Sequence, residues 1–144
     1  MSQALILPMA AHVALTAFLY VLLTVARAPA IWGIGRLPDG SNPWASTEPR
    51  ISANLSNQFE WPIFFHAACL ILQLTHVSPA AVMLAWTFIG GRVLHSGVQI
   101  LTRNVRLRGI VFTLNFLAGL ALWVLVVWPA GTPDRKSTRL NSSH

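Results

Sequence analysis

Four long apolar runs are the feature of this sequence that most restricts its fold. The chain has 144 residues, of which 54% are hydrophobic and only 10% are charged. A chain of this length cannot bury so much apolar surface inside a water-soluble domain, whereas runs of about twenty apolar residues are long enough to cross a bilayer as helices. The sequence therefore predicts an all-α integral membrane protein, a single four-helix bundle whose transmembrane helices run alternately up and down.

The predicted spans are separated by polar or turn-forming segments. They cover Leu5 to Ala26, Ile51 to Leu74, Pro79 to Leu101 and Arg108 to Trp128. The segment between the first two spans is rich in Gly, Pro, Ser and Asn, which is typical of a loop, and residues 75–78 leave room only for a tight turn. We interpret the first run as a retained helix and not as a signal peptide, because no basic segment precedes it and its apolar stretch is too long.

The last eleven residues, Asp134 to His144, differ abruptly from the rest of the chain. Their sequence, DRKSTRLNSSH, matches the in-frame translation of a sequencing adapter and contains the only lysine. We therefore take residues 1–133 as the membrane domain and set residues 134–144 aside as a non-native tail. Without this tail, seven arginines stand against three acidic residues.

The arginines lie almost entirely in two of the predicted loops and their flanks. These are Arg27, Arg36 and Arg50 at the first loop, and Arg103, Arg106 and Arg108 at the third. Cytoplasmic loops carry the excess of basic residues in membrane proteins, so we expect both loops in the cytoplasm and both termini outside. Topology and anionic membrane lipid account for these charges, and nucleic acid is not an expected partner.

Polar side chains inside the second and third spans fall at helical spacing. Asn57 and Glu60 are three residues apart in the second span. In the third, Arg92, His95 and Gln99 follow an i, i+3, i+7 pattern. Residues at such spacings share one face of a continuous helix, so each span is predicted to present a polar face to its neighbours.

The fourth span also carries polar residues at helical spacing, and two charged residues in the second and third spans lie at matching depth. Arg108, Phe112 and Asn115 are spaced to share a face of the fourth helix. Glu60 and Arg92 both lie about 13 Å from the cytoplasmic ends of their antiparallel helices, as judged from the helical rise. Matching depth predicts that these two side chains pair, which would offset the cost of placing each charge inside the membrane.

Two interpretations of these residues remain open. One is a structural ion pair that fixes the register of the helices. The other, which we favour, is a polar pocket open to the cytoplasm that binds a charged ligand, since ionisable groups within membrane helices usually mark functional sites. We interpret Cys69 as a packing residue, and the histidines show no metal-ligand spacing. We assign no role to His12, His66 and His76, because they lack polar neighbours at helical spacing.

The second span resembles a motif of the membrane-associated proteins in eicosanoid and glutathione metabolism, the MAPEG family. The second helix of that family has an arginine-rich start, then Asn-x-x-Glu and a nearby proline. The matching residues here are Arg50, Asn57, Glu60 and Pro62. The family commonly also has an arginine four residues before the asparagine, where this chain has Ala53.

The third and fourth spans carry the rest of the resemblance. The third helix of the family has Gly-Arg-x-x-His followed by a tyrosine; residues 91–95 match the first part, and Gln99 stands in place of the tyrosine. Arg108 matches the arginine that opens the fourth helix of microsomal prostaglandin E synthase within the family. The aromatic residue on that helix is Phe112, which has no hydroxyl.

The resemblance, to the bacterial type of member, implies a homotrimer in a bacterial inner membrane that binds glutathione between neighbouring subunits. It implies glutathione transferase or peroxidase chemistry, with glutathione as cosubstrate and a lipophilic small molecule, taken up from the membrane lipid, as the other substrate. The implied glutathione-binding residues are Arg50, Asn57, Glu60, Arg92, His95 and Gln99. Arg108 is the implied catalytic residue, because a nearby cation favours the reactive thiolate form of a thiol.

Two other functions are weighed beside this one. The lack of both family hydroxyls, at Gln99 and Phe112, favours a non-catalytic scaffold that binds lipid or glutathione in the membrane. A more remote alternative is a small proton-driven exporter with four helices. Such exporters depend on a glutamate in the first helix, and the first span here contains no acidic residue.

Overall fold

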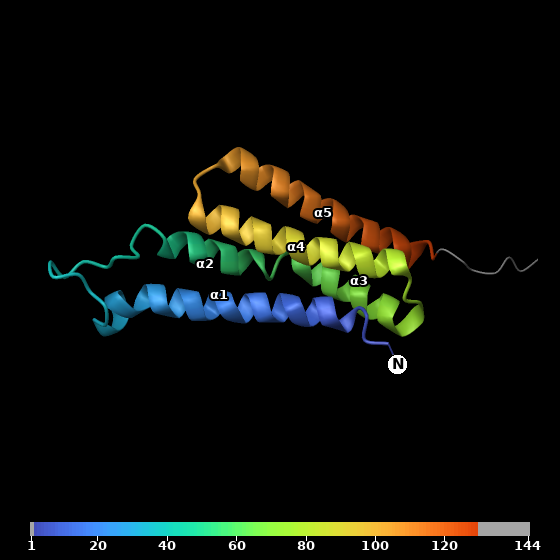
Figure 1. Cartoon of the computed structure of the whole chain (residues 1–144), viewed down its shortest axis with the longest axis horizontal. Coiled ribbons are helices and arrows are strands. Elements are labelled where there is room, and N and C mark those ends of the chain that lie inside the picture. The colour runs from blue at the N-terminus through green and yellow to red at the C-terminus, as the bar shows by residue number, and fades with distance from the viewer. Residues whose placement is uncertain (1, 130–144) are drawn as a thin grey trace, which may run out of the picture.

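The computed structural model describes residues 2–129, and every regular element within them is a helix. The helices are α1 (Ile6–Trp32), α2 (Glu48–Asn57), α3 (Trp61–Thr75), α4 (Pro79–Leu101) and α5 (Val105–Val127). Figure 1 shows α2 and α3 following one another along the bundle, so that together they take the place of the second predicted span. The predicted all-α membrane bundle is confirmed. The tail at 134–144 lies outside the described residues.

The other predicted spans agree with the helices at most of their ends. The third span coincides with α4, and the fourth differs from α5 by a few residues at its start. Helix α1 continues past the predicted end at Ala26 to Trp32, which shortens the first loop. Helices α1, α4 and α5 are each long and apolar enough to cross a membrane.

The second predicted span is interrupted between Asn57 and Trp61. Pro62 has no N–H to donate to the carbonyl of Gln58, and its ring would clash there, so one regular helix cannot continue through it. Instead α2 ends in tighter i→i+3 hydrogen bonds, and α3 begins with Pro62 in its first turn, where no N–H is needed. The prediction of one helix over 51–74 is wrong at this point, and Asn57 and Glu60 do not share a helix face.

Two apolar clusters hold the helices together. In the larger, Phe65 of α3 stacks on Phe88 of α4 with ring centroids 4.2 Å apart, beside Cys69. The smaller joins α1, α2 and the end of α4, with Leu19 and Ile51 among its members. Cys69 is fully buried in the larger cluster, which confirms its predicted packing role.

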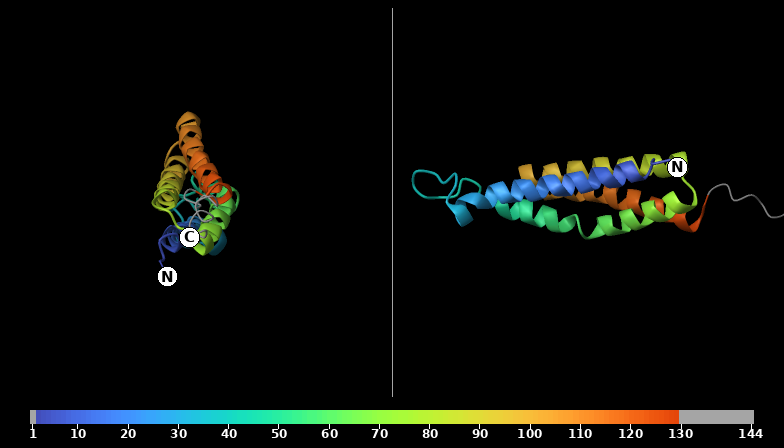
Figure 2. Two further views of the ribbon diagram at one scale, coloured as in Figure 1. Left: turned by 90° about the vertical axis from the view of Figure 1, so that its right-hand side faces the viewer. Right: turned by 90° about the horizontal axis from the view of Figure 1, so that it is seen from below.

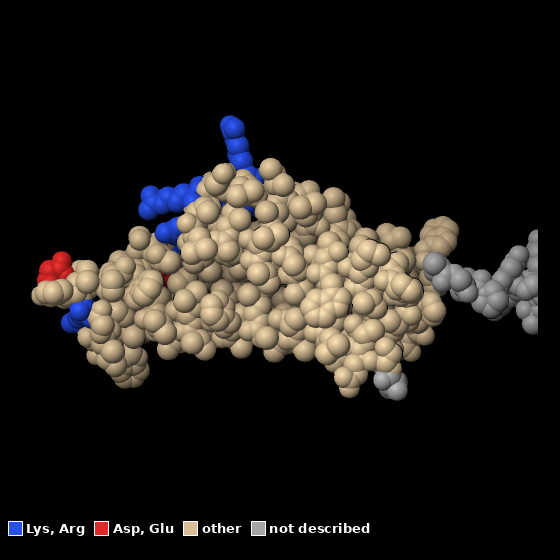
Figure 3. Space-filling view, viewed as in Figure 1, with Lys and Arg blue, Asp and Glu red and all other residues tan. Residues whose placement is uncertain are grey.

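The arginine-bearing segments lie at one end of the bundle. The loop 33–47 and the connection 102–104 meet at this end, and the turn 76–78 lies at the other (Figure 1). The right view of Figure 2 shows a long, narrow bundle from which the loop 33–47 projects at one end. On the face drawn in Figure 3, the charged side chains of the described residues gather at the same end, and the remaining surface is neutral. The arrangement agrees with alternating helix directions.

Candidate functional site

A cavity of about 400 Å³ lies beside the start of α5, at the end of the bundle that carries the arginines. Helix α5 packs on α4 and α3, and it leans away from the other helices at its start (Figure 1). The cavity is lined by Ala53 and Asn57 from α2, His95 and Gln99 from α4, and Val105, Arg108, Gly109 and Phe112 from α5. This lining has no acidic side chain and includes an arginine, so it suits an anionic ligand.

Gln99 joins α4 to α2 at the wall of this cavity. Its Oε1 accepts hydrogen bonds from Asn54 Nδ2 at 2.9 Å and from Asn57 Nδ2 at 3.2 Å. Its amide nitrogen has no hydrogen-bond partner in the described part of the chain. At the position where the family has a tyrosine, this N–H is therefore the donor that a bound ligand would meet.

Arg108 and His95 also line the cavity, and both have unused hydrogen-bonding capacity. Arg108 is exposed, and its guanidinium makes no ion pair with any described residue. His95 is buried, and its Nδ1 has no hydrogen-bond partner among residues 2–129. Because a buried polar atom without a partner is uncommon and costly, this nitrogen is a second atom that a ligand or a neighbouring subunit would satisfy.

Arg92 lies behind the wall of the cavity, with only 1% of its surface exposed. Its Nε donates to Gln58 Oε1 at 3.3 Å, and Nη2 donates to the backbone carbonyl of Asn57 at 3.1 Å. That carbonyl is free because α2 ends at Asn57, and the carbonyl end of a helix stabilises a cation. The helix break at Pro62 thus provides the acceptor that holds Arg92.

Glu60 makes no ion pair with Arg92 in the single chain, although its carboxylate is near enough to act on the guanidinium electrostatically. The one ion pair found in the described residues joins Arg27 to Glu48 at 2.7 Å, and Glu60 is exposed just before α3. The predicted pairing is wrong because it assumed one continuous helix, whereas the break gives Glu60 a different direction. The carboxylate lies at the positive start of α3, a favourable place for an anion, although it makes no capping hydrogen bond there. Arg92 is in direct contact with no carboxylate among the described residues.

Two other predicted residues lie outside the cavity lining. Arg50 donates to the carbonyl oxygens of Ser46 at 3.3 Å and Thr102 at 3.5 Å, which ties the start of α2 to the end of α4. Asn115 is buried against Gly91, and neither atom of its amide has a partner among the described residues. The expected face of the fourth span therefore meets the cavity through Arg108 and Phe112 but not through Asn115.

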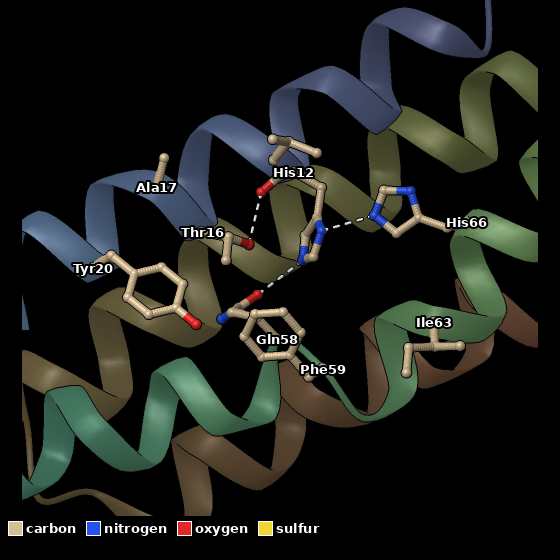
Figure 4. Close-up of a pocket in the computed structure, with 9 residues that line it drawn as sticks. His12, Thr16, Ala17, Tyr20, Gln58, Phe59, Ile63 and His66 are labelled. Carbon is tan, nitrogen blue, oxygen red and sulfur yellow. Dashed lines mark hydrogen bonds between the residues drawn. The ribbon is translucent and has the colours of Figure 1, made fainter.

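His12, His66 and Gln58 form polar contacts that helical spacing did not predict. His12 Nδ1 lies 2.9 Å from His66 Nε2, and His12 Nε2 lies 2.9 Å from Gln58 Oε1 (Figure 4). These residues border a second cavity, of about 350 Å³, between α1 and the break that separates α2 from α3. Spacing along the sequence reveals neighbours on the same helix only, and the partners of these side chains lie on other helices. The sequence feature that could have indicated these contacts was the presence of two histidines within apolar spans, since such groups usually have partners.

Comparison with known protein families gives one further observation. A model of the MAPEG family matches residues 5–128. The chain belongs to the MAPEG family. The match spans both helix motifs and nearly all the described residues, and it agrees with three helices long enough to cross a membrane. This MAPEG protein is an integral membrane protein with a function of the glutathione-related or eicosanoid type. Searches of curated proteins and of solved structures found no match.

Proposed function

We propose that this MAPEG protein binds glutathione in the cavity between α2, α4 and α5 and transfers its thiol to a lipophilic electrophile, as a glutathione transferase or peroxidase. The observation that carries the proposal is the lining of the cavity, which combines Arg108 with the amides of Asn57 and Gln99 and has no acidic side chain. Glutathione has two carboxylates, which suit the amide donors and the buried Arg92 beside the cavity, and a thiol whose reactive anion suits Arg108. The apolar helix faces around the site give access to a second substrate dissolved in lipid.

Arg92 adds to the positive charge near this cavity. A buried cation is costly unless a charge or hydrogen bonds compensate it. Two of the guanidinium nitrogens of Arg92 are bonded to neutral acceptors, and Nη1 has no partner in the described residues. A carboxylate of glutathione would supply the directly bonded negative charge that Arg92 lacks, so we assign Arg92 to binding.

Arg108 is the residue that we propose activates the thiol. The thiolate is the nucleophile, and a cation in the same cavity stabilises it. With an aryl chloride as electrophile, the S–C bond forms, the C–Cl bond breaks, chloride leaves and the thiol proton passes to solvent. The amide N–H of Gln99 supplies a hydrogen bond to the sulfur in place of a tyrosine hydroxyl.

Glu60 supports the proposal of a homotrimer with the site between subunits. Ionisable side chains within membrane spans rarely face lipid, and they usually have a partner or line a water-filled cavity. Glu60 is exposed at the break in the single chain. We propose that a neighbouring subunit covers it and that its carboxylate there binds the ammonium group of glutathione.

Calorimetry on the purified, detergent-solubilised protein tests the binding proposal. Glutathione should bind, and glutathione diethyl ester, whose carboxylates carry no charge, should bind about tenfold more weakly or worse, the loss expected for one charge-assisted hydrogen bond. Equal affinity for the two compounds would contradict a carboxylate site. Binding of neither would contradict the function itself.

The catalytic role of Arg108 predicts a separation of turnover from binding. With a chlorodinitrobenzene as electrophile, Arg108→Ala should lower kcat strongly while glutathione still binds, because a charge that acts on the thiolate is felt mainly in the chemical step. Arg106→Ala is the matched control, since Arg106 is exposed nearby but does not line the cavity. Equal losses in the two variants would point instead to the general charge of this end of the protein.

A non-catalytic scaffold is the second candidate. The observation that favours it is that the cavity lining contains no hydroxyl, since Gln99 and Phe112 occupy the positions where the family resemblance places hydroxyl-bearing residues. Glutathione binding without turnover on any of several electrophiles would support the scaffold and contradict the transferase.

A further inference from the structure

The polar residues on the far side of Arg92 form one connected chain of hydrogen bonds. Gln58 Oε1 accepts from Arg92 Nε at 3.3 Å and lies 2.9 Å from His12 Nε2. His12 Nδ1 in turn lies 2.9 Å from His66 Nε2. Figure 4 shows the contacts of His12 with both partners. This series of hydrogen bonds links α4 to the end of α2, then to α1 and to α3. It therefore connects every helix of the bundle except α5.

The chemistry of the side chains determines which atom donates in each of these hydrogen bonds. A guanidinium N–H can only donate, so the atom of Gln58 that faces Arg92 is the carbonyl oxygen. His12 Nε2 therefore carries a hydrogen and donates to the same oxygen. A second positive charge beside Arg92 in the interior would be costly, so His12 is neutral and its Nδ1 accepts the N–H of His66 Nε2.

Other contacts hold Gln58 in this orientation. Its amide nitrogen donates to the backbone carbonyl of Asn54 at 3.2 Å and to Ser96 Oγ at 3.4 Å. A backbone carbonyl can only accept, which again requires the nitrogen on that side and the oxygen toward Arg92. Gln58 is 2% exposed, so water does not compete for these contacts.

We propose that His12, His66 and Gln58 are positioning residues for Arg92. These hydrogen bonds hold the guanidinium through neutral groups, and the nearby Glu60 makes no ion pair with it, so the positive charge is available to an anion. A carboxylate at position 58 would hold Arg92 as well but would cancel that charge. The functional part of this inference rests on the proposed function, in which Arg92 binds a carboxylate of glutathione.

Two substitutions at His12 separate the link to Gln58 from the link to His66. A glutamine amide nitrogen occupies roughly the place of imidazole Nε2, and an asparagine amide nitrogen that of Nδ1. His12→Gln should therefore keep the donor to Gln58, whereas His12→Asn should lose it. We expect the Nε–H of Arg92, followed by hydrogen exchange in protein labelled with ¹⁵N-arginine, to stay protected in His12→Gln and to exchange at least about tenfold faster in His12→Asn, the effect of one lost hydrogen bond.

A charge substitution tests whether neutrality at position 58 matters. Gln58→Glu keeps the size and the acceptor of the side chain but gives Arg92 an acidic partner. It should lower glutathione affinity about tenfold or more, measured well below the midpoint of thermal unfolding. The midpoint itself should fall, because a carboxylate cannot donate to the backbone carbonyl of Asn54 as the amide does. Gln73→Glu is the matched control, because Gln73 is bonded to the chain near Leu5 and Ser2, away from Arg92. It should leave the affinity unchanged.

The two readouts distinguish failure of this inference from failure of the proposed function. If the unmutated protein binds no glutathione, the proposed function fails, and hydrogen exchange at Arg92 still decides the positioning role. Equal protection of the Arg92 Nε–H in both His12 variants would contradict the proposal that His12 positions Arg92 through Gln58. Unchanged glutathione affinity in Gln58→Glu would overturn the requirement for a neutral residue at position 58.

Discussion

Phe112 is the residue at which the chemistry of the cavity is most easily changed. It lines the cavity with 42% of its surface exposed, and its ring lies 6.0 Å from that of His95. Because the ring borders the cavity and is partly exposed, we expect a hydroxyl added to it to be accommodated without overpacking the helices. The substitution therefore adds a donor near the proposed thiolate at little cost in packing.

Phe112→Tyr is predicted to increase turnover of an aryl chloride. One hydrogen bond to a charged sulfur would raise kcat by about tenfold, measured as the initial rate at saturating glutathione. Phe116→Tyr is the control, because Phe116 lies one turn further along α5 and packs against Trp61, with ring centroids 4.6 Å apart. An equal change in the two variants would argue against a specific role of position 112.

At the scale of helices, the break between α2 and α3 organises the site. Pro62 ends the regular hydrogen bonding of the second span, and the freed carbonyl of Asn57 accepts from Arg92. The first turn of α3 is held by Trp61, which packs against Gly119 of α5. The closeness of this contact means that α3 and α5 can approach only because residue 119 has no side chain.

Gly119→Ala is predicted to destabilise the bundle. An added Cβ would lie 2.7 Å from Trp61 Nε1, and because the indole is rigid, the helices would have to shift. Overpacking of this kind costs about 1–3 kcal/mol, which should appear as a lower midpoint of thermal unfolding in detergent. Gly97→Ala is the matched control, since a Cβ at Gly97 would meet nothing within 4 Å and alanine favours a helix by about 1 kcal/mol. If Gly119→Ala unfolds at the same midpoint as the unmutated protein, the contact between Trp61 and residue 119 is not tight.

For the whole molecule, we predict that the end carrying the arginines is cytoplasmic. The basic loops lie together at one end, and the positive-inside rule places that end in the cytoplasm. In intact cells a membrane-impermeant maleimide should label His76→Cys and should leave Ser41→Cys unlabelled until the cells are opened. His76 is exposed, whereas its neighbour Val77 packs against the core, so position 76 is the better probe. Labelling of position 41 from outside would reverse the assignment.

The proposed assembly predicts a homotrimer in solution. An uncovered carboxylate facing lipid near the centre of a span costs about 2.5–3.5 kcal/mol, and Glu60 is exposed in the single chain. Native mass spectrometry from detergent should show three copies of the chain. A stable monomer that still binds glutathione would contradict a site shared between subunits.

Local sequence patterns determined the class of fold and part of the site. The length of an apolar run is set by the thickness of the bilayer, so the spans could be placed from the sequence, and α4 was predicted at both ends. Helical spacing likewise identified His95 and Gln99, which line the cavity together with Asn57 and Arg108. These features depend on residues close together in the chain.

Contacts between helices were decided only by the tertiary structure. Arg92 binds the end of α2 and not Glu60, because the break at Pro62 redirects one side chain and frees a carbonyl for the other. His12 and His66 meet because α1 and α3 are rotated so that the two imidazoles face each other. Spacing along one helix fixes which residues share a face, but it does not fix how that face is turned toward a neighbouring helix, which depends on the packing of the whole bundle.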